Sequence, residues 1–146
     1  MHVERSAVLH LPIPPQEALP LFTPEGEREW VAGWEPEPLH APGGSLSNEG
    51  AVFRTAVGGE ETLWLVLEVD SAAGRAAYVR ITPGSRLGTV HVRCVPADGG
   101  TDVTVRYRLT ALSPSGESVI EALTAEAFAT TIEGWRRDLE RLLAAG

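Results

Sequence analysis

The chain has 146 residues, of which 43% are hydrophobic and 22% are charged, the composition of an ordinary globular domain with its own core. Its formal net charge is −8, and it contains no lysine, so its strongly basic side chains are all arginines. The sequence therefore excludes a Schiff-base lysine and a P-loop lysine, and its acidic balance argues against binding to the phosphates of nucleic acids.

Residues 1–146 are expected to form one domain without a membrane span. No apolar run approaches the ~18 residues that a membrane-spanning helix needs, and the N-terminus lacks the basic and apolar blocks of a signal peptide. A cytoplasmic location is the expectation that follows.

The first third of the chain predicts a strand followed by two short helices. Polar and apolar residues alternate over 3–11, as in a strand, and the prolines within 12–15 end it because proline cannot donate to a β-ladder. Residues 16–22 form the first short helix. The sequence Thr23-Pro24-Glu25 is typical of the start of a second helix, and Gly33 suits its end.

Six further strands follow, separated by short turns rich in glycine. Their predicted ranges are 34–40, 51–58, 61–70, 75–83, 86–97 and 101–112. Such short connections predict antiparallel pairing of consecutive strands. Because Leu63, Leu65 and Leu67 share one face of their strand, we expect them on the concave, core-facing side and Trp64 on the convex side.

The last segment, 115–145, is predicted as a single helix of about 25–30 residues. Its apolar stripe follows the helical period through Ile120, Leu123, Ala127, Thr131, Trp135, Leu139 and Leu142, widened by Phe128 and Ile132. A helix with so wide an apolar face must cover something large, and the sheet is the one candidate.

This order of elements resembles the START-like or Bet v 1-like superfamily, also called SRPBCC, and in particular its polyketide cyclase/dehydrase-like bacterial members. Three stretches carry the resemblance: LHLPIPPQEALPLF, YVRITPGSRLGTVHVRC and VTVRYRLTALSPSGESVIEAL. It implies an α+β helix-grip fold, in which a curved seven-stranded antiparallel sheet grips the long C-terminal helix around an apolar cavity. It carries over no catalytic residue, because members share a cavity rather than a catalytic motif.

The resemblance places the two short helices at the mouth of that cavity, and so Trp30 and Trp34 at its rim. There the two indoles would cover the mouth or stack on a ligand; the alternative is that they pack the short helices onto the sheet. We expect the cavity to be lined by Phe53, Leu65, Tyr107, Leu123, Ala127 and Thr131. The small residues Ala127 and Thr131 are the specific reason to expect empty volume.

Tyr107, Thr124 and Thr131 are polar residues on faces that should be apolar. Their hydroxyl groups are candidates for binding a ligand's oxygen. The alternative for each threonine is a hydrogen bond to the carbonyl four residues back, from Thr124 to Ile120 and from Thr131 to Ala127.

Other reactive residues predict no site. The four histidines are scattered without zinc-site spacing, and Cys94 is expected to be buried and inert. Glu60 and Glu61 point to opposite faces of a strand and are read as solvated turn residues. We expect Arg80, Arg93, Arg106 and Arg108 to form a basic convex face.

No catalytic residue, metal or cofactor is assigned, and three functions stay open. The first is binding of a small hydrophobic or lipid-like molecule in the cavity. The second is an enzyme of the cyclase or dehydratase type on a polyketide-like substrate, which an inward carboxylate or histidine near Tyr107 would favour. The third is a protein-interaction domain, which a filled core without a cavity would favour.

Overall fold

The computed structural model describes residues 1–146. Its strands are β1 (His2–Leu11), β2 (Glu37–His40), β3 (Val52–Val57), β4 (Glu60–Asp70), β5 (Arg75–Thr82), β6 (Arg86–Ala97) and β7 (Gly100–Ala111). Its α-helices are α1 (Pro15–Ala18), α2 (Pro114–Ala122) and α3 (Ala125–Ala145), and its 3-10 helices are η1 (Leu19–Phe22), η2 (Gly26–Glu29) and η3 (Pro42–Gly44). None of these helices is both long and apolar enough to cross a membrane.

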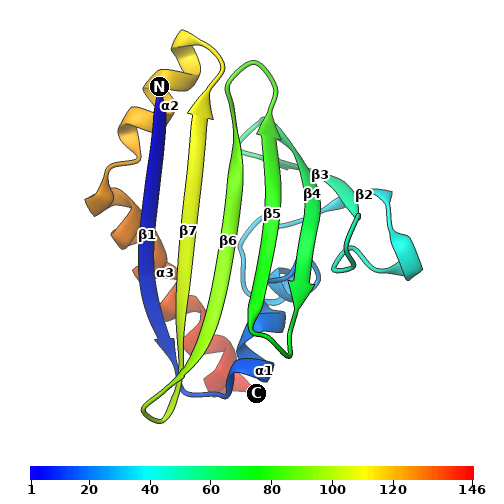
Figure 1. Ribbon diagram of the computed structural model, residues 1–146, viewed down its shortest axis with the longest axis vertical. Helices are drawn as coiled ribbons and strands as arrows, with labels where there is room; N and C mark the ends of the chain where they lie inside the picture. Colours follow the sequence, from blue (N-terminus) through cyan, green and yellow to red (C-terminus); the bar gives the residue numbers. More distant parts are fainter.

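The strands form one sheet in the order β1-β7-β6-β5-β4-β3-β2, and every neighbouring pair is antiparallel. Figure 1 shows the sheet curling, with β2 and β3 behind β4 and with α3 running diagonally across the concave side. The predicted α+β helix-grip fold with seven antiparallel strands is therefore confirmed. Glycine chemistry sets the turns: Gly58 and Gly59 both have positive φ (61° and 80°), as a two-residue hairpin turn requires.

The predicted short helices are present, though mostly as single turns. Residues 16–22 fall in α1 and η1, and the second predicted helix is the one-turn η2. The Thr23 hydroxyl accepts a hydrogen bond from the backbone N–H of Gly26 (3.1 Å) and donates one to the Pro20 carbonyl (2.7 Å). The predicted cap at Thr23 thus fixes the turn that carries Glu27 into the site described below.

The prediction of a single C-terminal helix is wrong, because the helix breaks at Leu123 and Thr124. Leu123 has ψ 67° and leaves the helical conformation, and the Thr124 hydroxyl then caps α3 by accepting from the N–H of Ala127 (3.1 Å). The Leu123 carbonyl freed by the break accepts a hydrogen bond from Arg5 Nε (2.8 Å). A good N-cap residue within the apolar pattern therefore starts a new helix rather than prolonging the first.

The predicted facing of β4 is also wrong. Trp64 points to the concave side with Thr62 and Val66, whereas Leu65 and Leu67 are exposed. The pairing with β5 shifts register between Val66 and Glu68. This bulge adds one residue, so the apolar run of alternate leucines does not mark a continuous inner face.

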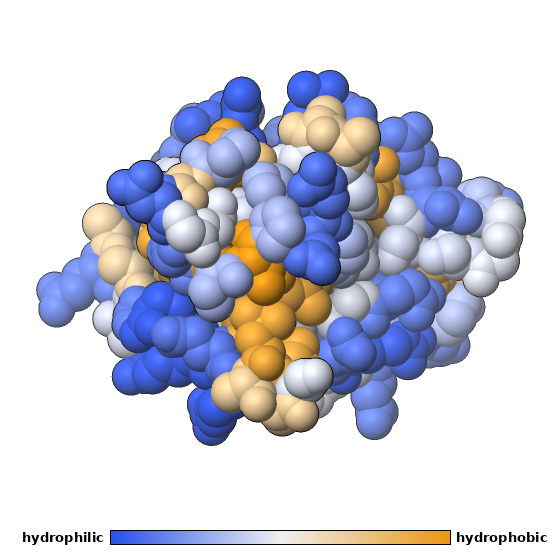
Figure 2. All heavy atoms as spheres, turned by 90° about the horizontal axis from the view of Figure 1, so that it is seen from below, coloured by the Kyte–Doolittle hydropathy of each residue, from blue (hydrophilic) through white to orange (hydrophobic).

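The core and the open part of the fold lie on different halves of the concave face. Phe128, Ile132 and Leu139 of α3 are buried with Val103 and Val105 of β7. On the other half, the inner face of β3–β6 is covered by the segment 22–34, which follows α1. The gap that this irregular segment leaves over the sheet is the cavity. Viewed from the end where α3 terminates, Figure 2 shows an apolar strip with polar atoms on both sides.

Candidate functional site

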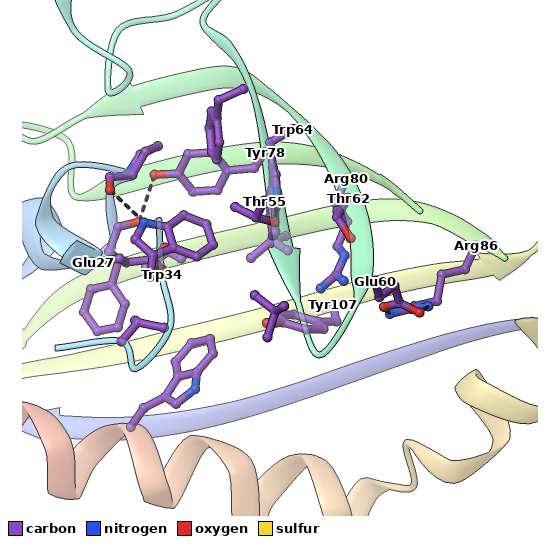
Figure 3. Close-up of a pocket in the computed structure, with 18 residues that line it drawn as sticks. Glu27, Trp34, Thr55, Glu60, Thr62, Trp64, Tyr78, Arg80, Arg86 and Tyr107 are labelled. Atoms are coloured by element: carbon purple, nitrogen blue, oxygen red, sulfur yellow. Dashed lines mark hydrogen bonds and ion pairs between the residues drawn. The ribbon is translucent and has the colours of Figure 1, made fainter. Parts of the chain in front are cut away.

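A cavity of about 380 Å³ lies between the concave sheet, the segment 22–34 and one residue of α3, Trp135. Figure 3 shows the side chains that converge on it from these elements. Its wall consists of Phe22, Pro24, Glu27, Val31, Trp34, Phe53, Thr55, Val57, Glu60, Thr62, Trp64, Tyr78, Arg80, Arg86, Val90, Val92, Tyr107 and Trp135. The volume is in the range usual for small-molecule sites.

Aromatic rings form much of the wall. Phe53 and Trp64, directly opposite each other on β3 and β4, stack with centroids 5.9 Å apart and planes 5° apart. Trp34 meets both rings edge-on, at 5.9 Å from Phe53 and 5.6 Å from Trp64. Tyr107 and Trp135 lie 6.5 Å apart on the side of α3. This arrangement presents flat apolar faces to an occupant of the cavity.

The two tryptophans of the short-helix region have different roles. Trp30 is buried in the core, where it packs edge-on against Phe22 and Trp135 and donates its indole N–H to the Leu21 carbonyl (2.7 Å). Its expected place at the cavity rim is therefore corrected. Trp34 does line the cavity, held by a hydrogen bond from its indole N–H to the Pro24 carbonyl (2.9 Å).

Hydrogen bonds fix the polar part of the wall. The hydroxyls of Thr62 and Thr82 are 2.8 Å apart, and the Trp64 indole N–H donates to the Thr55 hydroxyl (3.0 Å). Arg86 pairs with both carboxylate oxygens of Glu60, at 2.6 and 3.0 Å. Glu60 is thus more than a solvated turn residue, because it balances the charge of a buried arginine.

Glu27 of η2 brings a carboxyl group into the cavity. Burial raises the pKa of Glu27 from 4.5 to about 8, so the group is mainly protonated at neutral pH. Figure 3 shows it beside Trp34 at one end of the cavity, whereas Arg80, Glu60 and Arg86 lie toward the other end. Tyr78 is not free to pair with it as a donor, because its hydroxyl donates to the Phe22 carbonyl (2.9 Å).

Arg80 of β5 also points inward, which corrects its expected place on the basic convex face. It lies opposite Trp64, and its guanidinium carbon is 5.0 Å from the centroid of that ring. On the outer side of the sheet, Arg93, Arg106 and Arg108 do gather with Arg75 around a groove. Alternation along β5 places Arg80 on the same face as Tyr78, and this spacing was the available signal.

The other expected lining residues lie away from the cavity. Leu65 is exposed, because it lies on the face of β4 opposite to Trp64 and Val66. Leu123 packs against the core at the helix break, and Thr124 is the cap of α3. Ala127 and Thr131 miss the cavity because Phe128, Ile132 and Trp135, not these small residues, form the sheet-facing side of α3.

The alternative roles considered for the threonines have separate outcomes. Thr131 is exposed and donates to the Ala127 carbonyl (3.1 Å), as the backbone alternative predicts. Thr124 instead accepts from the N–H of Ala127.

Cys94 is buried as expected, and burial raises its pKa to about 11. No group of three or more His, Cys, Asp or Glu side chains is placed to hold a metal ion.

Of the nine expected site residues, the structure therefore brings Trp34, Phe53 and Tyr107 together. Glu27 and the Arg86–Glu60 pair were missed. The pattern gave no signal for Glu27, since it is one of four glutamates within a short acidic stretch. Its position depends on the irregular backbone of the segment 22–34.

No protein-family model matches the sequence, and no curated protein matches it at a significant level. Solved structures do match its fold. A protein from Thermus thermophilus is 20% identical, with a TM-score of 0.68 and 99% of each chain covered. Ara h 8.0201 is 14% identical, with a TM-score of 0.64, over 93% of this chain and 98% of that chain. Norcoclaurine synthase from Thalictrum flavum is 13% identical, with a TM-score of 0.65, over 97% of this chain and 88% of that chain. At these identities the likeness shows the fold alone.

Proposed function

We propose that this chain, which has the Bet v 1-like (SRPBCC) fold, binds a small hydrophobic molecule in the cavity between its sheet and the segment 22–34. The observation that carries the proposal is the cavity of about 380 Å³ walled by Trp34, Phe53, Trp64, Tyr107 and Trp135. Ordinary protein packing leaves few voids larger than a water molecule, so an opening of this size with aromatic walls is typical of a ligand site.

A structural neighbour supports the chemical class. The norcoclaurine synthase of similar fold is known in complex with dopamine and hydroxybenzaldehyde, two small aromatic molecules. In the present chain, the stacked pair Phe53 and Trp64 and the edge-on Trp34 offer the surfaces against which such rings pack. We therefore favour an aromatic or alicyclic ligand over a long acyl chain.

A neutral fluorescent probe, N-phenylnaphthylamine, tests the proposal. We expect its fluorescence to rise on binding and the tryptophan emission to fall, because three of the four tryptophans line the cavity. Val92→Phe places a ring into the cavity from β6 and should weaken probe binding about tenfold or more with little change in melting temperature. The matched control, Ala129→Phe, adds the same ring on the exposed side of α3 and should bind like the wild type.

Two results would contradict the proposal. One is equal probe binding by Val92→Phe and the wild type. The other is no binding by the wild type together with a loss of roughly 1–3 kcal/mol of stability in Val92→Phe, which is the cost of overpacking a filled core.

A second candidate function is an acid–base enzyme of the cyclase or dehydratase type. It is favoured by Glu27, an inward carboxyl group in the same cavity as Tyr107, with a pKa raised to about 8 by burial. Native mass spectrometry of freshly purified protein separates the two functions. If a small molecule co-purifies and the protein does not convert it to a product, binding is supported. If the wild type converts it and Glu27→Gln does not, an enzyme is supported.

A protein-interaction role has less support. It would be favoured by a core that is filled, whereas this structure contains a cavity. The outer basic groove contains Arg75, Arg93, Arg106 and Arg108, of which Arg75 pairs with Glu68 and Arg108 with Glu4. Surface pairing of this kind accounts for two of the four arginines without a partner protein.

A further inference from the structure

Arg80 is a largely buried cation without a counter-ion. Its guanidinium carbon lies 5.0 Å from the ring centroid of Trp64 and 6.0 Å from that of Tyr107. Its Nε is inaccessible to solvent and has no hydrogen-bond partner. No carboxylate lies within ion-pair distance of its side chain.

The neighbouring arginine shows what Arg80 lacks. Arg86 also lines the cavity and is buried, but two hydrogen bonds to Glu60 balance its charge. Arg80 has no carboxylate partner and lies against the rings of Trp64 and Tyr107, where cation–π contacts recover part of the cost of removing a charge from water. An unpaired charge in such a place is expensive, and the cavity that Arg80 lines is where an anionic partner can reach its guanidinium group.

The chain offers no acid to complete this site. Glu60 is engaged by Arg86, and Glu27 lies toward the other end of the cavity (Figure 3). A guanidinium presents a planar fork of donors that matches an anionic group with two acceptor oxygens. The remaining source of such a group is the occupant of the cavity, which borders Arg80 directly.

We propose that Arg80 binds the carboxylate of the ligand, so that the ligand class is an aromatic or alicyclic carboxylic acid whose apolar body lies against Trp34, Phe53 and Trp64. This inference rests on the proposed function. A single guanidinium balances one negative charge, which favours a carboxylate over a phosphate monoester with its charge of about −1.5 to −2. A cavity of about 150 Å³ binds benzene, so about 380 Å³ admits a body of two fused rings.

Paired ligands that differ only in charge test the inference: naphthoate, its neutral isostere naphthamide, and naphthyl phosphate. Near neutral pH we expect the wild type to bind naphthoate about tenfold or more tightly than naphthamide, with naphthyl phosphate weaker than naphthoate. Arg80→Met removes the guanidinium group but keeps an unbranched side chain, and it should abolish the preference for naphthoate. Arg93→Met, on the outer face of β6, changes the net charge equally and should keep it.

The outcomes separate this inference from the proposed function. Binding of N-phenylnaphthylamine in the cavity with equal affinity for naphthoate and naphthamide would overturn the role of Arg80 and leave the cavity as a ligand site. An unchanged naphthoate preference in Arg80→Met would also overturn it. Tighter binding of naphthyl phosphate than of naphthoate would replace the carboxylate with a phosphate and so reject the ligand class. Circular dichroism of Arg80→Met shows whether the variant keeps the fold in which these affinities are compared.

Discussion

Replacing Glu27 with glutamine should make the protein more stable at alkaline pH and leave its stability nearly unchanged at acid pH. Burial raises the pKa of Glu27 from 4.5 to about 8. At a pH below the pKa of the unfolded chain, the carboxyl group is protonated in both the folded and the unfolded state, so its titration has no effect on the free energy of unfolding. At a pH between the unfolded and the folded pKa, the unfolded chain releases the proton and the folded protein keeps it, so stability falls as the pH rises.

The size of the effect follows from the shift. Each pKa unit corresponds to about 1.4 kcal/mol, so the full shift would approach about 5 kcal/mol above pH 8. The cavity beside the carboxyl admits water, which weakens the penalty, and we expect about 2–3 kcal/mol. Glutamine has no proton to lose, so Glu27→Gln should lack this decline.

Urea denaturation followed by circular dichroism, repeated from about pH 4 to about pH 9, measures the difference in unfolding free energy between Glu27→Gln and the wild type. That difference should grow with pH and level off above pH 8. Glu29→Gln, an exposed position in the same 3-10 helix, should give a difference that does not vary with pH. A difference for Glu27→Gln that is equally flat would refute the burial of this carboxyl group.

Three further outcomes follow from the fold. Trp64→Ala should lower the free energy of unfolding by about 2 kcal/mol, because the Trp64 ring packs on Phe53 and Trp34, whereas Leu65→Ala on the exposed face should lower it by under about 1 kcal/mol. If urea denaturation gave the opposite ranking, Leu65 rather than Trp64 would face the core. Thr124→Ala should cost about 1 kcal/mol through the lost cap of α3, and no measurable loss would mean that the two helices do not depend on that cap. The Cys94 thiol, whose pKa burial raises from 9.0 to about 11, should react with a thiol reagent near pH 8 about 100-fold more slowly in the folded than in the urea-unfolded protein; equal rates would place it at the surface.

The sequence was informative where a pattern extends over many residues. Alternation along β7 and the glycine turns specify the sheet, since each antiparallel hairpin is set by local chemistry. The position of Tyr107 on the inner face follows from the same alternation. Its place in the cavity wall could thus be predicted from the amino-acid pattern alone.

Prediction failed where one residue changes the pattern. A single bulge in β4, between Val66 and Glu68, breaks the alternation, so that Val69 packs against the core while Leu65 is exposed. A threonine inside an apolar stripe ends one helix and starts another. Neither the bulge nor the helix break produces a periodic pattern of polar and apolar residues from which it could be predicted. Glu27 was missed for a related reason, because its environment depends on how the segment 22–34 crosses the cavity, whereas the inward position of Arg80 follows from its alternation with Tyr78 along β5.

The most direct test of ligand binding in this cavity uses the four tryptophan indole N–H groups as reporters in a nitrogen–proton NMR spectrum. Trp34 and Trp64 line the cavity, whereas Trp30 is packed in the core with its N–H bonded to the Leu21 carbonyl. On titration with N-phenylnaphthylamine, the Trp34 and Trp64 signals should shift most and the Trp30 signal least. Shifts confined to Trp30, or no shift in any indole signal at saturating probe, would contradict a ligand site between the sheet and the segment 22–34.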